Sequence, residues 1–260
     1  MTTSSQDTLV PFYKPAALEE GPSGSVADYV LHEMARRIVD GEYRPGQRLV
    51  EAELTQDLGV SRSSVREALR RLEINRFVRI EPNRGATVAT PNRDEIVAQF
   101  RIREVLCGLG ARAAAERVHL PGNKAIMQSL LDEIEVQRAL GSEKNHRRDN
   151  GRFHRAINEM SGIAEIGELL DQSNFPILHT IYFRDLSHAH WERNMSDHLD
   201  IARAVFNGDP VAAEHFAKQH MHRMVDIAVA IATQLQQESR TTAVARRSQS
   251  RRKSAPDASA

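Results

Sequence analysis

The chain has 260 residues, of which 40% are apolar and 27% are charged, enough to bury a core in one large domain or two ordinary ones. Its 35 Lys and Arg residues balance 35 Asp and Glu residues, so any contact with nucleic acid requires a local basic patch. The single cysteine, Cys107, excludes an internal disulfide, and no apolar run approaches the ~20 residues that cross a bilayer. We therefore expect a cytoplasmic protein without membrane contact. Because only 5% of the residues are aromatic and Ala, Leu, Arg and Glu are abundant, we expect a mainly α fold.

The N-terminal part divides into an arm and a small folded unit. Residues 1–24 mix Ser, Thr, Pro and Gly without apolar periodicity, which predicts a flexible arm. Residues 25–90 predict three helices and a two-stranded β-hairpin. The helices are expected at 26–40, 51–58 and 61–75, and the strands at 77–80 and 86–88.

The remainder of the chain shows helical periodicity and no convincing strand. Residues 91–238 therefore predict an all-α helical bundle, a second domain after the hairpin. The segment 239–260 is rich in Ser, Ala and Arg and aperiodic, which predicts a disordered basic tail. Helices of the bundle are expected at 93–117, 122–140, 145–160, 163–172, 174–190, 195–207 and 210–238.

Three helices followed by a hairpin are the sequence outline of a winged helix-turn-helix, and Gly59-Val60-Ser61 would form its turn. Ser61 can cap the third helix and leave that helix's positive N-terminal end facing a phosphate. Arg62 and Arg66 lie one turn apart near this end, and the guanidinium fork matches guanine O6 and N7. This pattern predicts binding to double-stranded DNA.

Arginines outnumber acidic residues between Ser61 and Arg84, and they supply the local basic patch. Arg84 and Gly85 at the hairpin tip would place a guanidinium in or beside the minor groove. The alternative is a solvated helix face stabilised by pairs such as Glu67 with Arg71. The predicted DNA-binding residues are Arg62, Ser63, Ser64, Arg66, Arg70, Arg84 and Gly85.

Polar residues at helical spacing predict a metal site in the bundle. Asn150 and His154 leave the same face of one helix, and His198 and His220 lie on two later helices. Imidazole suits divalent first-row metals such as zinc, nickel or iron. The alternative is that these histidines are hydrogen-bonded core or surface residues, because the chain has 11 histidines and many combinations are open.

The N-terminal motifs resemble those of the GntR superfamily of transcriptional regulators. They are Arg44-Pro-Gly-Gln-Arg-Leu49, Glu51-Ala-Glu-Leu54, Leu58-Gly-Val-Ser-Arg-Ser-Ser-Val-Arg-Glu-Ala-Leu-Arg-Arg-Leu72 and Asn83-Arg-Gly-Ala86. The resemblance implies that Arg62, Ser63, Arg66, Arg84 and Gly85 contact an operator. Some members of the FadR subfamily carry a DNA-contacting arginine in the second helix, where this chain has Glu51-Ala52-Glu53.

The C-terminal motifs are similar to those of the FCD effector-binding domain of the FadR subfamily, and the resemblance covers roughly residues 25–238. They are Asn150-Gly-Arg-Phe-His-Arg-Ala-Ile157 with Ser161-Gly162, then Asp197-His198-Leu-Asp-Ile201, Gly208-Asp209 and His220. The resemblance implies that a divalent metal is held by Asn150, His154, His198 and His220. Asn150 makes the ligand set neutral, and Cys107 stands where family members commonly have Glu.

Arg101 and Arg103 are the predicted effector-binding residues, because arginine binds carboxylates bidentately. The alternative, which the sequence supports equally well, is that these arginines form surface ion pairs with Glu104. The whole pattern predicts a bacterial repressor, not an enzyme, that binds a pseudo-palindromic operator as a homodimer and responds to a small organic acid. Two alternatives remain open. The first is a metal-dependent hydrolase or oxygenase that uses Asp149 or Asp197 as its base, and the second is a nonspecific nucleoid protein.

Overall fold

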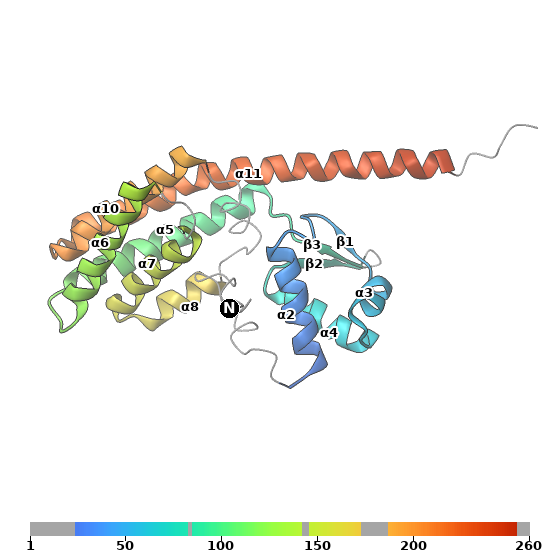
Figure 1. The fold of residues 1–260 in the computed structure, drawn as a ribbon, viewed down its shortest axis with the longest axis horizontal. Helices are drawn as coiled ribbons and strands as arrows, with labels where there is room; N and C mark the ends of the chain where they lie inside the picture. The colour runs from blue at the N-terminus through green and yellow to red at the C-terminus, as the bar shows by residue number, and fades with distance from the viewer. Residues whose placement is uncertain (1–23, 83–84, 142–145, 173–186, 254–260) are drawn as a thin grey trace, which may run out of the picture.

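The computed structural model describes residues 24–82, 85–141, 146–172 and 187–253. In the N-terminal part, the described residues form three helices and three short strands beside a larger helical bundle (Figure 1). Three helices followed by a hairpin confirm the predicted winged helix-turn-helix. The elements are α2 (Val26–Val39), β1 (Arg48–Leu49), α3 (Glu51–Leu58), α4 (Arg62–Ile74), β2 (Val78–Glu81) and β3 (Gly85–Val88).

Local capping determines where these helices begin and end. Ser25 caps α2 in a capping box, in which its hydroxyl accepts from the Asp28 amide at 3.1 Å. Gly59 ends α3 with φ at 64°, a left-handed conformation that favours glycine. Ser61 then caps α4, because its hydroxyl accepts from the Ser64 amide at 3.2 Å. The predicted turn between the two helices is therefore present.

The sheet has three strands rather than the predicted two. Its order is β1-β3-β2, all antiparallel, with Arg48 opposite Thr87 and Val78 opposite Val88. The sequence reasoning missed β1 because a strand of two residues is too short to show alternation. Its pairing with β3 depends on a tertiary contact, which local propensity does not encode.

The bundle elements are α5 (Arg93–Glu116), α6 (Asn123–Leu140), α7 (His146–Ser161), α8 (Ala164–Gln172), α10 (His188–Phe206) and α11 (Pro210–Lys253). The predicted start of the sixth bundle helix at residue 195 was wrong, since Ser187 caps α10 and its hydroxyl accepts from the His190 amide. Most of the helix predicted at 174–190 lies outside the described residues. The disordered tail predicted at 239–260 also differs from the structure as far as Lys253, because α11 continues to that residue. A nucleated helix extends easily through Ala, Arg and Gln.

Helices α5 and α11 pack along each other and connect the two parts of the molecule (Figure 1). The core of the winged helix-turn-helix includes Leu31, Leu72 and Phe77, and it also takes in Ala228 and Ala232 of α11. A second core lies within the bundle around Trp191 and other apolar residues of α5, α6, α7, α10 and α11. The long helix α11 therefore contributes side chains to both cores. None of the described helices is long and apolar enough to span a membrane.

Candidate nucleic-acid interface and metal centre

Helix α4 has one buried face and one cationic face. Val65, Leu69 and Leu72 are at most 3% exposed and pack into the N-terminal core. The opposite side carries exposed side chains, including three predicted DNA-binding arginines. The predicted DNA-binding positions exposed on α4 are Arg62, Ser63, Arg66 and Arg70, and Glu67, Glu73 and Ile74 are exposed beside them. The amphipathic pattern thus presents guanidinium groups to solvent from the helix that follows the turn.

Three serines cluster at the N-terminus of α4. The Ser61 hydroxyl lies 2.8 Å from the Ser63 hydroxyl and 2.9 Å from the Ser64 hydroxyl. Ser63 is exposed, whereas Ser64 is partly buried. Because the Ser64 amide also donates to the Ser61 hydroxyl, the Ser64 residue belongs to the cap. Of the two predicted contacts, Ser63 is the one that faces solvent.

Within the described part of the chain, two ion pairs link α4 to α2 and α3, and the sequence reasoning identified neither. Arg66 Nε donates to Glu51 on α3 at 2.8 Å. Arg71 donates to Asp28 on α2 at 2.5 Å. This contact and the Ser25 hydroxyl hold the pKa of Asp28 below its ordinary value, because both hydrogen bonds favour the carboxylate. Partners 15 and 43 residues apart can be paired only once the fold is known.

The wing of the domain is the hairpin formed by β2 and β3. Gly85 begins β3, is exposed, and has φ at 79°, which a side chain rarely tolerates. Arg84, predicted to contact DNA beside it, lies outside the described residues. On the exposed side of the sheet, Arg48 stands opposite Thr87. The strand β1 beside the wing therefore offers a further exposed basic side chain, Arg48, which the sequence reasoning did not identify.

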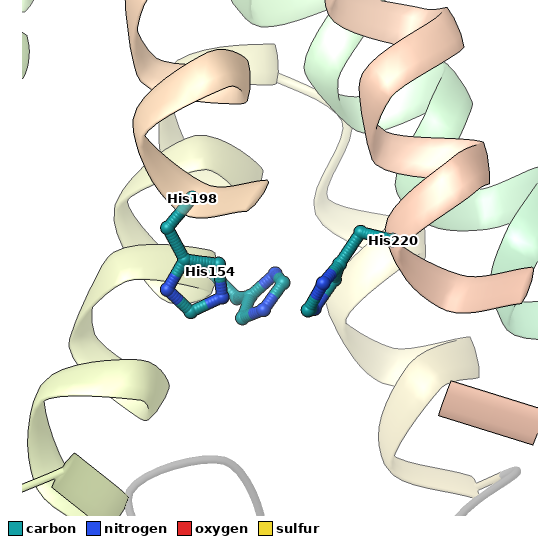
Figure 2. A group of neighbouring side chains, drawn as sticks. All are labelled: His154, His198 and His220. Atoms are coloured by element: carbon teal, nitrogen blue, oxygen red, sulfur yellow. The ribbon is translucent and has the colours of Figure 1, made fainter. Parts of the chain in front are cut away.

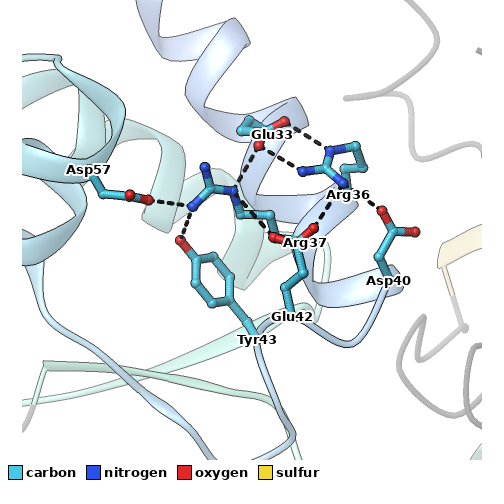
Figure 3. A network of polar contacts seen from close by, with 7 residues as sticks. All are labelled: Glu33, Arg36, Arg37, Asp40, Glu42, Tyr43 and Asp57. Carbon is cyan, nitrogen blue, oxygen red and sulfur yellow. Dashed lines mark hydrogen bonds and ion pairs between the residues drawn. The ribbon is translucent and has the colours of Figure 1, made fainter. Parts of the chain in front are cut away.

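A network of ion pairs ties α2 to α3 (Figure 3). Arg37 donates to Glu33 at 2.7 Å and to the Tyr43 hydroxyl at 3.1 Å, and it also donates to Asp57 at the end of α3. Arg36 binds the same Glu33 at 2.9 Å. Hydrogen bonds from Arg36 and then Arg37 lower the pKa of Glu33 to about 2, against the opposing effect of burial. Through Arg37 and Asp57, the network links α2 to the end of α3.

Three histidines from three helices meet inside the bundle (Figure 2). His154 on α7, His198 on α10 and His220 on α11 are 8%, 1% and 2% exposed. One ligand nitrogen from each lies within 4.8 Å of the others. Their ring centroids are 4.9 to 5.4 Å apart. The structure thus brings together the three histidines that the spacing and the resemblance indicated.

An acidic residue orients one of these rings. Asp197 Oδ2 lies 3.2 Å from His220 Nδ1, and Arg223 donates twice to the same carboxylate, at 2.9 and 2.5 Å. Burial alone would raise the pKa of Asp197, but the hydrogen bonds from His220 and Arg223 outweigh it and hold the pKa below its ordinary value. A carboxylate at Nδ1 favours the tautomer that leaves the Nε2 lone pair available. Sequence reasoning considered Asp197 as a base and missed this orienting role.

The donor set fits a divalent metal that prefers imidazole. His198 is buried, and burial together with the neighbouring His154, His220 and His146 depresses its pKa well below the ordinary value, which favours the neutral ring. Its Nε2 has no hydrogen-bond partner among the described residues. A buried ring nitrogen without a partner is costly, and metal coordination through its lone pair would satisfy it. Zinc and nickel accept neutral imidazole ligands of this kind.

The remaining predicted site residues are Asn150 on α7 and Arg101 and Arg103 on α5. Asn150 is 8% exposed and lies one turn before His154 on α7. Arg103 is 9% exposed and donates to the Leu170 carbonyl at 3.3 Å, whereas Arg101 faces solvent. The two arginines point to different sides of α5, since residues two apart on a helix do not share a face. Burial raises the pKa of Cys107, in keeping with a small core residue.

Comparison with known proteins assigns both halves of the chain. The profile described as "Bacterial regulatory proteins, gntR family" matches residues 27–88. The FCD domain profile matches residues 98–223. The chain belongs to the GntR family and carries an FCD domain. This GntR-FCD protein is therefore a DNA-binding transcriptional regulator with an effector-binding domain, and not an enzyme.

Individual relatives agree with this assignment. The GntR-FCD protein is 28% identical to the transcriptional regulator McbR of Escherichia coli over 156 residues, which are 59% of this chain and 70% of McbR. It is 24% identical to the repressor RspR of E. coli over 204 residues, which are 78% and 89% of the two chains.

Solved structures support the fold. A putative GntR regulator from Rhodococcus sp. RHA1 has a TM-score of 0.61 at 24% identity, covering 80% of this chain and 99% of its own. E. coli McbR/YncC has a TM-score of 0.59 at 22% identity, covering 79% and 97%. These likenesses confirm the predicted mainly α architecture of a winged helix-turn-helix followed by a helical bundle.

Proposed function

We propose that the GntR-FCD protein binds a pseudo-palindromic operator as a homodimer, and that a small organic acid bound near a metal in the bundle controls this binding. The observation that carries the proposal is the exposed arginine face of α4, placed directly after the capped turn. Residues 25–90 would read the DNA, and residues 91–238 would bind the effector and dimerise. The bacterial cytoplasm, and the nucleoid when DNA is bound, is the proposed location.

Operator recognition would come from α4 and the wing. Arg62, Arg66 and Arg70 are exposed on one side of α4, where a recognition helix meets base edges and phosphates. Ser63 can donate to a phosphate, and Ser64 supports it through the cap. Arg84 and Gly85 would enter or flank the minor groove from the tip of the wing.

Dimerisation has a candidate face on α5. Ile102, Val105 and Leu109 are 52%, 61% and 42% exposed and recur at helical spacing on the outer side of this helix. An apolar stripe of this kind on a helix is a contact surface. A second copy of the chain would cover it around a twofold axis and place two winged helix-turn-helix units on two half-sites.

The metal would be held by His154, His198 and His220, with Asn150 as the fourth ligand. When bound, the metal would offer a Lewis-acidic position to an effector carboxylate. Asp197 holds His220 with its Nε2 lone pair available, and Arg223 in turn holds Asp197. Arg103 is the better placed of the two predicted effector residues, because it is buried in the same domain.

Helix α11 supports a coupling between the bundle and the DNA-binding domain. His220 lies on α11 two and three turns before Ala228 and Ala232, which pack in the core of the winged helix-turn-helix. An effector that prefers one placement of α11 would shift the DNA-binding domains. Relatives named as repressors, including RspR and the galactonate operon repressor of E. coli, favour release of DNA as the outcome.

The metal and effector claims can be tested on the full chain. Metal-free protein is titrated with Zn²⁺ or Ni²⁺ by calorimetry, and a panel of small carboxylic acids is then screened by thermal shift with and without metal. His198→Ala should abolish metal binding, whereas His215→Ala, at an exposed histidine outside the triad, should not. Tight metal binding by His198→Ala, or acid binding that is indifferent to metal in the intact protein, would contradict the proposal.

A further inference from the structure

One of the exposed arginines of α4 is held and another is not. Arg66 Nε donates to Glu51 Oε2 at 2.8 Å, and the two side chains are 63% and 38% exposed. Arg62, one turn earlier on the same face, has no hydrogen bond or ion pair within the described part of the chain. Before DNA binds, the Arg66 guanidinium is therefore hydrogen-bonded to a carboxylate, whereas that of Arg62 is not.

We propose that Glu51 is a positioning residue that makes Arg66 the base-reading arginine of α4, specific for guanine. The inference rests on the proposed binding of an operator by α4. The carboxylate occupies the Nε side of the guanidinium and leaves the Nη1 and Nη2 edge uncommitted among the described contacts. Two parallel N–H groups on that edge match O6 and N7 of guanine in the major groove.

Fixing the Arg66 side chain before DNA binds reduces the conformational entropy that it loses on binding. A free arginine loses much of its rotamer freedom when it binds, whereas Arg66 has already lost part of it to Glu51. A fixed fork also rejects bases whose acceptors do not match, because a mismatch leaves its donors without acceptors. Arg62, which is unrestrained in the described structure, suits an adaptable phosphate contact instead.

A carboxylate beside DNA is repelled by the phosphates, and this repulsion makes the proposal testable. Glu51 repels phosphates, so its removal should strengthen binding to every duplex. If Glu51 also positions Arg66, the same removal should weaken the choice of base. A purely repulsive acid would change affinity alone, and a purely structural residue would lower thermal stability and all DNA binding together.

Glu53 provides a matched control. It lies with Glu51 in the first turn of α3 and is exposed, but among the described residues no hydrogen bond or ion pair joins it to Arg66. Glu51→Gln and Glu53→Gln therefore remove the same charge from the same helix turn. Only the first changes the partner of Arg66, and the amide oxygen of Gln preserves a weaker acceptor. Glu51→Ala removes the acceptor entirely.

The experiment compares full-length wild type, Glu51→Ala, Glu51→Gln, Glu53→Gln and Arg66→Ala by selection from random duplexes and by anisotropy across a salt series. Thermal melting identifies any unfolded variant. Glu51→Ala should lose about tenfold or more of the preference for guanine at one position of each half-site, as should Arg66→Ala. Glu51→Ala should also bind unrelated duplexes more tightly, and Glu51→Gln should lose less preference.

The controls separate the possible failures. Glu53→Gln should raise affinity for unrelated duplexes and keep the wild-type consensus. A wild-type consensus that survives in Glu51→Ala overturns the positioning role and leaves the proposed function intact. A consensus that also survives in Arg66→Ala overturns the assignment of Arg66 to a base. Wild type without any consensus overturns the proposed operator binding and, with it, this inference.

Discussion

The ion pairs of the partly buried Glu33 on α2 make a quantitative prediction for Glu33→Gln. Hydrogen bonds from Arg36 and Arg37 lower the pKa of Glu33 from 4.5 to about 2. At about 1.4 kcal/mol per pH unit, this corresponds to at most about 3 kcal/mol of stabilisation at neutral pH. Arg36 is 37% exposed, so solvent screening reduces the expected loss on substitution to about 1–2 kcal/mol.

The sign of the pH dependence follows from the lowered pKa. The stabilisation is complete above the unfolded-state pKa of 4.5 and is lost as the pH falls toward about 2. Urea unfolding followed by circular dichroism at pH 7 and pH 3 should therefore show a difference between wild type and Glu33→Gln that shrinks at low pH. Glu42→Gln, at a side chain 50% exposed, should change stability by less than about 0.5 kcal/mol. A Glu33→Gln variant as stable as wild type at pH 7 would refute the reasoning.

Three further predictions concern the bundle and the tail. Asp197→Asn should weaken Zn²⁺ or Ni²⁺ binding about 10- to 100-fold in calorimetry, because His220 loses its orienting carboxylate; unchanged affinity would remove that role. Val105→Glu should shift the chain from dimer to monomer in sedimentation, since it buries a charge in the proposed interface; a persistent dimer would place the interface elsewhere. Deletion of residues 240–260, which include the basic run from Arg246 to Lys253, should keep the consensus and reduce the salt dependence of binding, and an unchanged salt slope would exclude a phosphate contact by the tail.

The parts of the fold that local chemistry determines could be predicted from the sequence. Gly59 and Ser61 predict the turn and the cap between α3 and α4. A left-handed glycine ends a helix and an N-cap serine begins one through contacts within a few residues along the chain. Strand β1 could not be predicted, since two residues carry no period and their pairing is tertiary. The start of α10 was predicted wrongly for a different reason. Several polar residues near Ser187 could cap a helix, and the sequence alone does not show that Ser187 is the one that does.

The candidate sites divide in the same way. The spacing of Asn150 and His154 and the family resemblance identified the histidines that meet in the bundle. Asp197 and Arg223, which orient His220, lie 23 and 3 residues away from it and have no sequence signature of that role. The pairing of Glu51 with Arg66 likewise depends on how α3 packs against α4. Residue type therefore predicts which groups can act, and packing decides which of them are oriented.

The most direct test of the account is selection of bound duplexes from a random pool by the purified full-length protein at physiological salt. The account predicts enrichment of one pseudo-palindrome with two half-sites about one helical turn apart. Retention of DNA without a consensus would support a nonspecific nucleoid protein instead, and the absence of retention would contradict the assignment of α4 as the recognition helix.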